Sequence, residues 1–503
     1  MTEVSDTKMQ PSSEKDESSF EATGANESQS VDIPRHTSFV NVVVIATACL
    51  GGFLYGFSAN IISGTLAQTT FIAKFLTGSN ATQITDGLFG GFLGGAMVGS
   101  LVQAPISNKF GRKIANACAS IIVLISAALQ AGSVSIEMFL TARVLCGIGA
   151  GMVLSNTPVY MSEVSPPHNR GLLVGLQGVG IVSAYIIAAL CALAFSFVKS
   201  AIQWRLNFIV LAVIACIHLG SLYFLPESPR WLMEKGRDED AIKVLQYLHN
   251  TESDPNATLA QAEAVQIKAQ VETEKLLPKG FIYIFSTPHL RKRAFCSILL
   301  WIMGQGTGIT AIANLVPTFM AGLGFGTTVQ LGLGVVWSVF VGGIGSAAIL
   351  SVMAALVKYY LGSTNQAGTN ALVALYFIFG AFFTSTVECT SYVYGSEIWP
   401  THLRSEGSTL AYASFFGNAI AYSAPVSVAL KNIGWEFYMI LVSVTVVSAI
   451  GIMFYFPETM GLSLEEINTK FGDKVEVELK DAFVGESRGA AVLVDSAESS
   501  KSG

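Results

Sequence analysis

Charged residues are scarce in this sequence. Asp, Glu, Lys and Arg make up 13% of the 503 residues, against about 25% in an ordinary soluble domain. Together with 51% hydrophobic residues, this scarcity excludes a disordered chain, a coiled coil and a nucleic-acid binder. So few charges over so long a chain imply a polytopic protein whose surroundings are the lipid bilayer.

Catalytic and metal-binding patterns are missing as well. The seven cysteines lie singly inside apolar runs, where they fit as small core residues rather than as disulfide or metal-ligand pairs. No nucleophile–base pairing, metal spacing or phosphate-binding loop occurs, so the sequence predicts neither an enzyme nor a cofactor or metal site. The glycine pairs Gly90-Gly91 and Gly94-Gly95 are typical of closely packed helices.

Apolar runs long enough to span a bilayer recur along the chain. Six precede a polar stretch and five follow it, near 39–65, 88–107, 114–133, 137–157, 172–196 and 205–225, then 294–320, 329–357, 369–395, 409–428 and 435–456. Only helices satisfy backbone groups in lipid over such runs, so the predicted fold class is all-α. The expected organisation is a disordered cytosolic tail at 1–37, a six-helix bundle at 38–225, a cytosolic loop with short amphipathic helices at 226–293, a C-terminal helix bundle at 294–460 and a cytosolic tail at 461–503.

The basic residues of the loops predict an orientation. The stretch 226–293 carries ten Lys and Arg, whereas the loop after the first run has only Lys74. Positive charge stays on the cytosolic side, so the central loop and the N-terminus are expected to be cytosolic. The sequon at Asn80 then lies outside and is a candidate glycosylation site.

Two parts of the chain resemble each other at a nearly constant offset. Residues 160–170 match residues 394–404 in six residue types, 234 positions apart. A second pair, Pro226-Glu227-Ser228 and Pro457-Glu458-Thr459, is 231 positions apart. Matched loops in register predict a duplicated six-helix unit, a pattern typical of secondary transporters.

The second half is short by about one span, so only eleven apolar runs are visible. The run 329–357 has 29 residues, whereas two spans need about 40. A partner of the basic loop Gly111-Arg112-Lys113 is expected near residue 345, where an uncharged Gly-rich stretch stands. An odd number of spans would also put Arg404 outside, against its match with Arg170. The sequence therefore favours a missing segment, from a splice variant or an incorrect gene model, over a breakdown of the pairing.

The motifs in combination resemble those of sugar porters of the major facilitator superfamily, of the fungal or broader eukaryotic kind, over roughly residues 39 to 470. The matching residues are Gly111-Arg112-Lys113, Arg143 with Gly147 and Gly149, Pro158, Tyr160, Glu163, Pro166 and Arg170-Gly171, Pro226-Glu227-Ser228-Pro229-Arg230, Glu397 to Arg404, and Pro457-Glu458-Thr459 with Gly461. The resemblance implies two six-helix halves that rock around a central site.

The resemblance also implies a latch made of charges. An unpaired arginine inside an apolar run costs about 2.5 kcal/mol or more, so Arg143 is expected to pair with Glu163 or Glu397, or to reach the interface. In the family such charges hold the inward side shut, and the residues implied for this gating are Arg112, Arg143, Glu163, Arg170, Glu227, Arg230, Glu397, Arg404 and Glu458. Snorkelling interfacial charges are the alternative interpretation. Asn108 stands where the family has an acidic residue, so a weaker latch is expected.

The predicted substrate pocket matches the family less well than the scaffold does, and glucose is not carried over as the substrate. Sugar hydroxyls need neutral donors and acceptors. The residues proposed to bind substrate are Gln177, Gln305, Thr310, Asn314, Tyr392 and Asn418. Interhelical hydrogen bonding, worth about 0.6 kcal/mol a contact, is the alternative role for each.

One position in the first predicted helix helps to separate passive transport from proton-coupled transport. Proton-coupled members of the family carry an acidic residue where Ser58 stands here, which favours passive transport. Glu388 is the only charged residue between Lys358 and Glu397, and it is the alternative proton site.

The leading hypothesis is a monomeric carrier for a sugar or polyol in the plasma membrane, facilitative and working by alternating access. Proton-coupled symport through Glu388 is one alternative. The others are a transporter-like nutrient sensor and an inactive splice or gene-model variant. Accumulation of a labelled substrate in vesicles would separate a carrier from a sensor.

Overall fold

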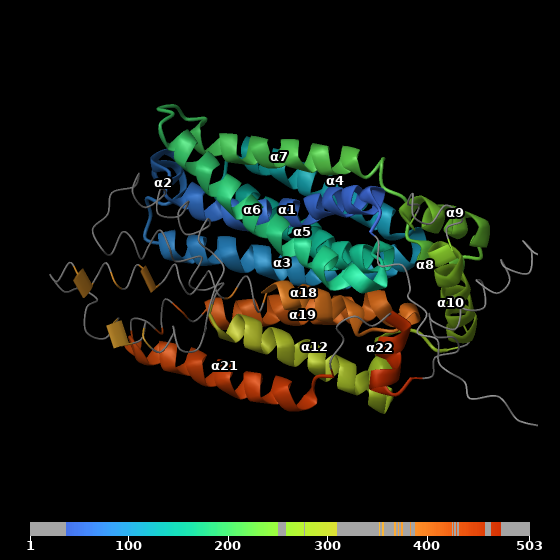
Figure 1. The fold of residues 1–503 in the computed structure, drawn as a ribbon. Helices are drawn as coiled ribbons and strands as arrows, with labels where there is room; N and C mark the ends of the chain where they lie inside the picture. Colours follow the sequence, from blue (N-terminus) through green and yellow to red (C-terminus); the bar gives the residue numbers. More distant parts are fainter. Residues whose placement is uncertain are drawn as a thin grey trace, which may run out of the picture.

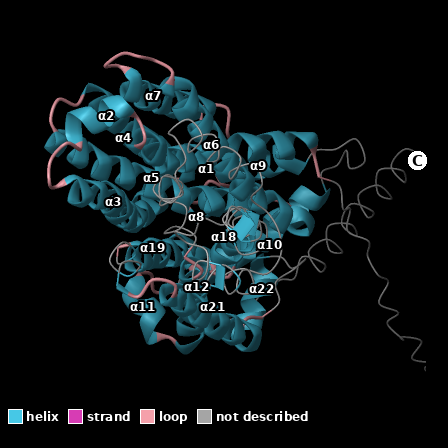
Figure 2. Ribbon diagram, turned by 90° about the vertical axis from the view of Figure 1, so that its left-hand side faces the viewer, coloured by secondary structure: helices cyan, strands magenta, loops and turns pink. Residues whose placement is uncertain are grey.

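The computed structural model describes residues 37–249, 258–275, 277–308, 388–424, 432–457 and 464–473, and a few single residues elsewhere. The regular elements in these ranges are helices, and they form two bundles that lie side by side (Figures 1 and 2). The predicted run 329–357 and most of 369–395 lie outside the described residues, and so does the proposed missing span. The all-α prediction is confirmed.

The N-terminal bundle contains α1 (Phe39–Leu66), α2 (Thr69–Phe75), α3 (Ala81–Phe110), α4 (Arg112–Gly132), α5 (Ile136–Val164), the 3₁₀ turn η1 (Pro167–Asn169), α6 (Arg170–Ser196) and α7 (Gln203–Ser221). Within the described residues, the six helices other than the short α2 and η1 are long and apolar enough to cross a membrane. They coincide with the six apolar runs predicted for the first half.

The second bundle contains α11 (Phe281–Ser286), α12 (Pro288–Gly306), α18 (Cys389–Glu397), the turn η3 (Thr401–Leu403), α19 (Arg404–Ser423), α21 (Glu436–Tyr455) and α22 (Leu464–Phe471). In the described part of the connection between the bundles there are three helices: α8 (Pro229–Glu234), α9 (Asp238–His249) and α10 (Thr258–Glu274). They pack at one end of the molecule, which we call the linker end (Figure 1). The helical spacing of Ala241, Val244, Leu245 and Leu248 predicts one buried face of α9, and all of these except the partly buried Val244 are fully buried.

Several motif residues lie in helices rather than in the loops where the sequence analysis placed them. Pro158 and Glu163 belong to the last two turns of α5, and only Gly111 separates α3 from α4. The apolar runs in the sequence end before the helices do, because the last turns of a helix are polar where it leaves the lipid. Gly111 has φ +100, and a Cβ there would collide with the Glu227 carboxylate, so both the backbone and the contact require glycine.

Glycines bring α3 and α5 into close contact. A Cβ added at Gly95 or Gly99 would overlap the backbone carbonyls of α5, and one at Gly147 or Gly151 would overlap those of α3. This spacing of four residues on both helices lets the backbones touch. Of the four glycines that the sequence singled out, Gly90 and Gly94 face open space, because a Cβ added there would meet no atom within 4 Å, so only part of that set serves packing.

Candidate functional site

A buried ion pair lies at the linker end of the N-terminal bundle. Arg112 Nε and Nη2 donate to the two carboxylate oxygens of Glu163 at 2.9 and 3.0 Å. Both side chains are almost completely buried, at 1% and 0% exposed. The geometry is bidentate, which is the strongest arrangement for this pair of groups. The pair fastens the start of α4 to the end of α5.

The same carboxylate also reaches the second bundle. Arg404 Nη1, at the start of α19, lies 3.5 Å from Glu163 Oε1. In the reciprocal position, Glu397 at the end of α18 interacts electrostatically with Arg170 and Arg404. Because Glu163 and Arg170 match Glu397 and Arg404 in the repeat, these contacts are related by the internal symmetry of the chain. Charges of each half therefore face those of the other.

Glu227 caps the N-terminus of α4. Its Oε1 accepts from the backbone N–H of Arg112 at 3.0 Å, and its Oε2 accepts from that of Lys113 at 3.2 Å. A carboxylate at a helix N-terminus satisfies free N–H groups and complements the helix dipole. Burial nevertheless raises the pKa of Glu227 above its ordinary value.

The linker helix α10 contributes two buried carboxylates, each paired with a histidine. Glu263 Oε2 lies 2.8 Å from His249 Nε2 on α9, and Glu274 Oε2 lies 3.2 Å from His402 Nδ1 on η3. Burial alone would raise the pKa of Glu274, but the hydrogen bonds and charge of His402 outweigh it and hold that pKa below its ordinary value. The second pair ties α10 to the C-terminal bundle.

Arg143 does not pair with Glu163 or Glu397, which corrects the expectation from the sequence. Its Nη1 donates to the Ser58 carbonyl at 2.7 Å and its Nη2 to the Ala59 carbonyl at 3.3 Å. Its guanidinium carbon lies 4.1 Å from the centre of the Phe92 ring. Twenty residues of α5 separate Arg143 from Glu163, which is about 30 Å along a helix. The arginine therefore joins α5 to α1 and α3 far from the linker end.

An aromatic cluster occupies the contact between the bundles. Trp301 of α12 lies 5.7 Å from Tyr392 of α18 and 5.9 Å from Tyr412 of α19, measured between ring centroids. Tyr392 and Tyr412 are stacked at 6.2 Å. Across the interface, Tyr55 of α1 meets Phe416 of α19 edge to face, also at 6.2 Å. We call these five residues the aromatic cluster.

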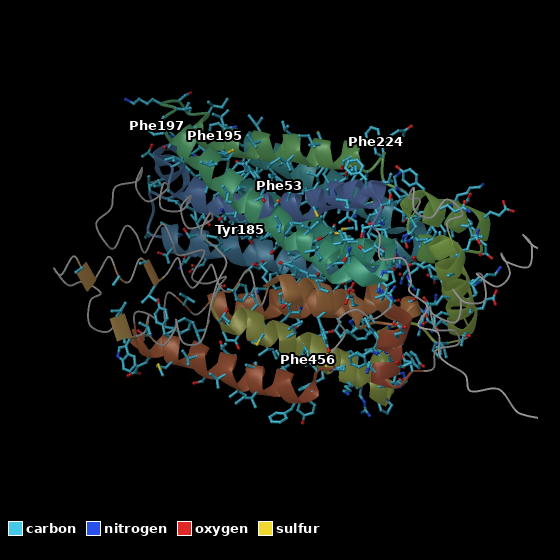
Figure 3. All side chains as sticks on the ribbon, viewed as in Figure 1. Phe53, Tyr185, Phe195, Phe197, Phe224 and Phe456 are labelled. Atoms are coloured by element: carbon cyan, nitrogen blue, oxygen red, sulfur yellow. The ribbon has the colours of Figure 1, made fainter. Side chains whose placement is uncertain are left out.

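Polar atoms within this cluster are buried without a hydrogen-bond partner. Among the described residues, none bonds to Trp301 Nε1 or to the Tyr412 hydroxyl, although the two side chains are 1% and 0% exposed. Glu388 is one helical turn before Tyr392 and accepts from its hydroxyl at 3.0 Å. The phenols of Tyr55 and Tyr185 also interact electrostatically with Glu388. Figure 3 shows Tyr185 part-way along α6, away from Phe224 at the linker end and Phe195 and Phe197 at the other end.

Comparison with known proteins gives the context for these features. The sugar (and other) transporter family matches residues 44–471. The chain belongs to this family. Its members are transporters rather than enzymes, so the two bundles and their charged linker end are parts of a transporter.

The transporter also resembles individual relatives over most of its length. It is 32% identical to the MFS-type transporter criB of Aspergillus cristatus, over 85% of this chain and 92% of the relative. Identity is 27% with a high-affinity glucose transporter of Kluyveromyces lactis, over 86% of each chain, and 27% with a quinate permease of Neurospora africana, over 88% of this chain and 91% of the permease.

Solved structures confirm the fold. The proton:xylose symporter XylE bound to 6-bromo-6-deoxy-D-glucose superposes with a TM-score of 0.73 at 23% identity, covering 87% of this chain and all of the symporter. An inward-open XylE structure from E. coli gives 0.63 at 23% identity, covering 86% and 99%. The predicted major facilitator architecture is thereby confirmed for the transporter.

The remaining predicted residues are scattered over the described part of the transporter. Gln177 is buried in α6 and donates to the Leu154 carbonyl of α5 at 3.4 Å. Asn418 bonds to Ser414 of its own helix, with Nδ2 2.8 Å from the carbonyl. Gln305 is buried one turn after Trp301. Arg230 reaches Thr401 Oγ1 at 3.5 Å. Thr310, Asn314 and Glu458 lie outside the described residues.

Sequence reasoning missed Tyr55, Trp301 and Tyr412. Aromatic residues in an apolar run carry no signal that separates a pocket from lipid contact. Trp301 alone had a cue, because it precedes the predicted Gln305 by four residues and so shares its helix face.

Proposed function

We propose that this transporter carries a sugar or polyol across the membrane by alternating access, without proton coupling. The observation that supports a polyhydroxylated substrate concerns two buried polar atoms of the aromatic cluster. Trp301 Nε1 and the Tyr412 hydroxyl have no hydrogen-bond partner among the residues that the structure describes. A buried polar group without a partner costs about 1–3 kcal/mol. A ligand with several neutral hydroxyls can satisfy such groups while its ring stacks on aromatic faces.

The gating role of the charged residues is part of the same proposal. Glu163–Arg404 and Glu397–Arg170 join the halves at the linker end, which supports a state that is closed on that side. Rocking of the halves would break these contacts and open the site to that side. Arg112 and Glu227 would support these contacts from the N-terminal half, and Arg230 of α8 reaches Thr401 of the second half. Arg143 would hold α5 on α1 during the motion.

Counterflow in proteoliposomes tests the substrate. Proteoliposomes that contain the purified full-length protein are loaded with one unlabelled sugar or polyol at a time. Entry of the same compound in labelled form is then measured. Trp301→Phe and Tyr412→Phe keep an aromatic ring but remove one polar atom each. Because a hydrogen bond contributes about 1 kcal/mol, each is expected to raise KM about fivefold.

Tyr438→Phe is the matched control, because Tyr438 is a buried tyrosine of α21 outside the aromatic cluster. It should leave KM unchanged. The proposal fails if no sugar or polyol shows saturable counterflow, or if all three variants behave alike. Binding of a sugar without counterflow would favour a sensor.

Proton coupling through Glu388 is a second candidate, favoured by one observation. The carboxyl group is buried, accepts from Tyr392 and lies beside the aromatic cluster, where protonation could respond to substrate. In this case Glu388→Gln would abolish uphill uptake driven by a pH gradient but preserve counterflow. For the facilitative carrier, uptake in wild type and in Glu388→Gln shows the same pH dependence.

We infer that the linker end is cytosolic and that the carrier is a monomer of the plasma membrane. Few basic residues are described at the opposite end, among them Lys74 and Lys199, whereas the segment 226–293 carries ten Lys and Arg. Asn80 is exposed at that opposite end and could carry a glycan. Fluorescence of a tagged chain at the cell surface, and a glycosidase-sensitive mass that Asn80→Gln abolishes, test this assignment.

A further inference from the structure

Exposed aromatic residues mark the edge of the lipid-facing surface near the linker end. Tyr223 and Phe224 follow α7, and Phe454 and Tyr455 lie at the end of α21. All four side chains are exposed, and the two pairs are 231 positions apart, the same offset as the matched Pro-Glu motifs. Aromatic residues gather where a membrane protein leaves the lipid. The internal repeat therefore places the same boundary on both bundles.

Two basic residues lie just beyond this boundary in the second bundle, where α12 begins at the linker end (Figure 1). Phe295 of α12 meets Tyr455 of α21 edge to face, with ring centroids 5.7 Å apart. Arg291 precedes Phe295 by four residues, so the two share one face of α12 and are about 6 Å apart along its axis. Lys292 is adjacent, and both basic side chains are exposed. The headgroup layer extends about 5–7 Å beyond the hydrocarbon on each side, so Arg291 is at the height of the lipid phosphates.

Within the part of the chain that the structure describes, no carboxylate forms an ion pair with Arg291 or Lys292. The neighbouring Arg293 is buried and takes the carboxylate of Asp473. Lys292 Nζ lies 5.7 Å from the ring centre of Phe471 on α22, which carries no full negative charge. An anion from outside the chain can therefore approach both exposed cations.

The short helix α11, directly before α12, adds an apolar surface to these cations. Ile284 is buried against the second bundle, with Phe281 and Tyr283 partly buried beside it. Ile282 and Phe285 are exposed instead, and Ile282 is 89% exposed. A helix that packs on protein along one face and carries apolar residues outside it is suited to the membrane interface, where those residues reach the acyl chains. Charge and apolar surface thus lie together at the depth of a phospholipid.

We propose that this surface binds an anionic phospholipid of the leaflet at the linker end. We call it the lipid site, and it consists of Ile282, Phe285, Arg291, Lys292 and Phe295. The two cations attract the negatively charged headgroup, and the three apolar side chains contact its acyl chains. A zwitterionic lipid offers the same chains without net charge, so it binds more weakly. The inference needs neither a substrate nor a conformational cycle, so it is independent of the function proposed above.

Native mass spectrometry of the purified full-length protein tests the lipid site. Protein in detergent is titrated with dioleoyl phosphatidylserine or, separately, with dioleoyl phosphatidylcholine, and the dissociation constant of the first bound lipid is measured. Each basic residue close to anionic lipid strengthens binding about fivefold. Wild type should therefore bind phosphatidylserine at least about tenfold more tightly than phosphatidylcholine. Arg291→Gln/Lys292→Gln should raise the constant for phosphatidylserine about tenfold or more and leave that for phosphatidylcholine within about twofold.

Lys243→Gln/Lys275→Gln is the matched control, because it removes the same charge from two exposed lysines outside the lipid site. It should leave the constant for phosphatidylserine within about twofold of wild type. Arg291→Lys keeps the charge and should do the same. Ile282→Ser/Phe285→Ser keeps both cations but removes apolar contact, so it should weaken binding of both lipids by a similar factor of about fivefold or more.

Three results would overturn the proposal. The first is an unchanged constant for phosphatidylserine in Arg291→Gln/Lys292→Gln or in Ile282→Ser/Phe285→Ser. The second is an equal loss in Lys243→Gln/Lys275→Gln, because the overall positive charge would then account for the binding. The third is displacement of phosphatidylserine by an equal concentration of glycerophosphoserine, which has the headgroup without acyl chains. The surface would then bind a soluble phosphate ester rather than a lipid.

Discussion

The buried Arg112–Glu163 pair allows a sharp prediction about stability. Arg112→Gln removes a bidentate partner from a carboxylate that is 0% exposed. Glu163 would then keep its hydrogen bond with Ser228 and the contact with Arg404, whose Nη1 lies farther away at 3.5 Å. Unlike the contact of Arg404 with Glu163, which joins the two halves, this pair lies within one half, so the proposed rocking of the halves would leave it intact. Its loss should therefore lower the stability of the fold itself.

The expected magnitude follows from the burial of both partners. Removal of one member of a buried ion pair costs about 3–5 kcal/mol, because the other charge is left without compensation. Glu163→Gln should cost at least as much, since two arginines lose their carboxylate. In the double variant Arg112→Gln/Glu163→Gln, neither position of the pair keeps an unpaired charge. The cost of the double variant should therefore be well below the sum of the two single costs.

Chemical unfolding in detergent, followed by tryptophan fluorescence, measures these free energies. Lys113→Gln is the control, because within the described residues the neighbouring lysine side chain makes one exposed hydrogen bond, to the Tyr223 carbonyl. It should change the free energy of unfolding by less than about 0.5 kcal/mol. A cost below about 1 kcal/mol for Arg112→Gln, or additive costs in the double variant, would refute the idea that this ion pair stabilises the N-terminal bundle.

Two further predictions concern packing and pH. Gly99→Leu should lower the free energy of unfolding by about 1–3 kcal/mol or more, because any Cβ there overlaps an α5 carbonyl, whereas Gly94→Leu faces open space and should be tolerated. The lowered pKa of Glu274 should keep α10 docked until the pH falls below the ordinary carboxyl value of about 4.5. His402→Gln removes the stabilising partner, so hydrogen exchange of α10 should accelerate at a higher pH; an unchanged midpoint would contradict the pairing.

The sequence predicted the long-range architecture because membrane helices leave a strong signal. Continuous apolar runs identified all six spans of the first half, and the repeat offset placed Glu163 opposite Glu397 and Arg170 opposite Arg404. Equal offsets relate the two halves by symmetry, so their reciprocal contacts follow from the repeat. The predicted short second half lies outside the described residues and stays a prediction.

Partners of single residues were harder to predict, because a sequence does not give depth in the membrane. Arg143 and Glu163 share α5, and pairing them by charge alone ignored the length of helix between them. Carbonyl oxygens of α1 provided the ligands instead, near Ser58. Any helix can expose carbonyls in this way, so no residue type marks such a partner in advance.

The aromatic cluster could not be predicted for a related reason. Trp301 is 1% exposed, whereas Tyr223 and Phe454 are 82% and 78% exposed, yet all three are aromatic residues in or beside apolar runs. In a soluble domain the exposed ones would be anomalous. In a membrane protein lipid is as good a solvent for them as the core is, so hydrophobicity does not separate the two environments.

The strength of the contacts differs in a way that suits two rocking bodies. Within the N-terminal half, Arg112 and Glu163 form a bidentate pair at 2.9 and 3.0 Å, and Gly99 packs against bare backbone of α5. Across the halves, the contact of Arg404 with Glu163 is longer, at 3.5 Å, and a single hydrogen bond joins Asn108 to Glu406. Alternating access requires both states to be populated, so the contacts made in only one of them can differ by no more than a few kcal/mol in total. Tight contacts within the N-terminal half and looser ones between the halves suit that requirement, because rocking would then break only the looser set.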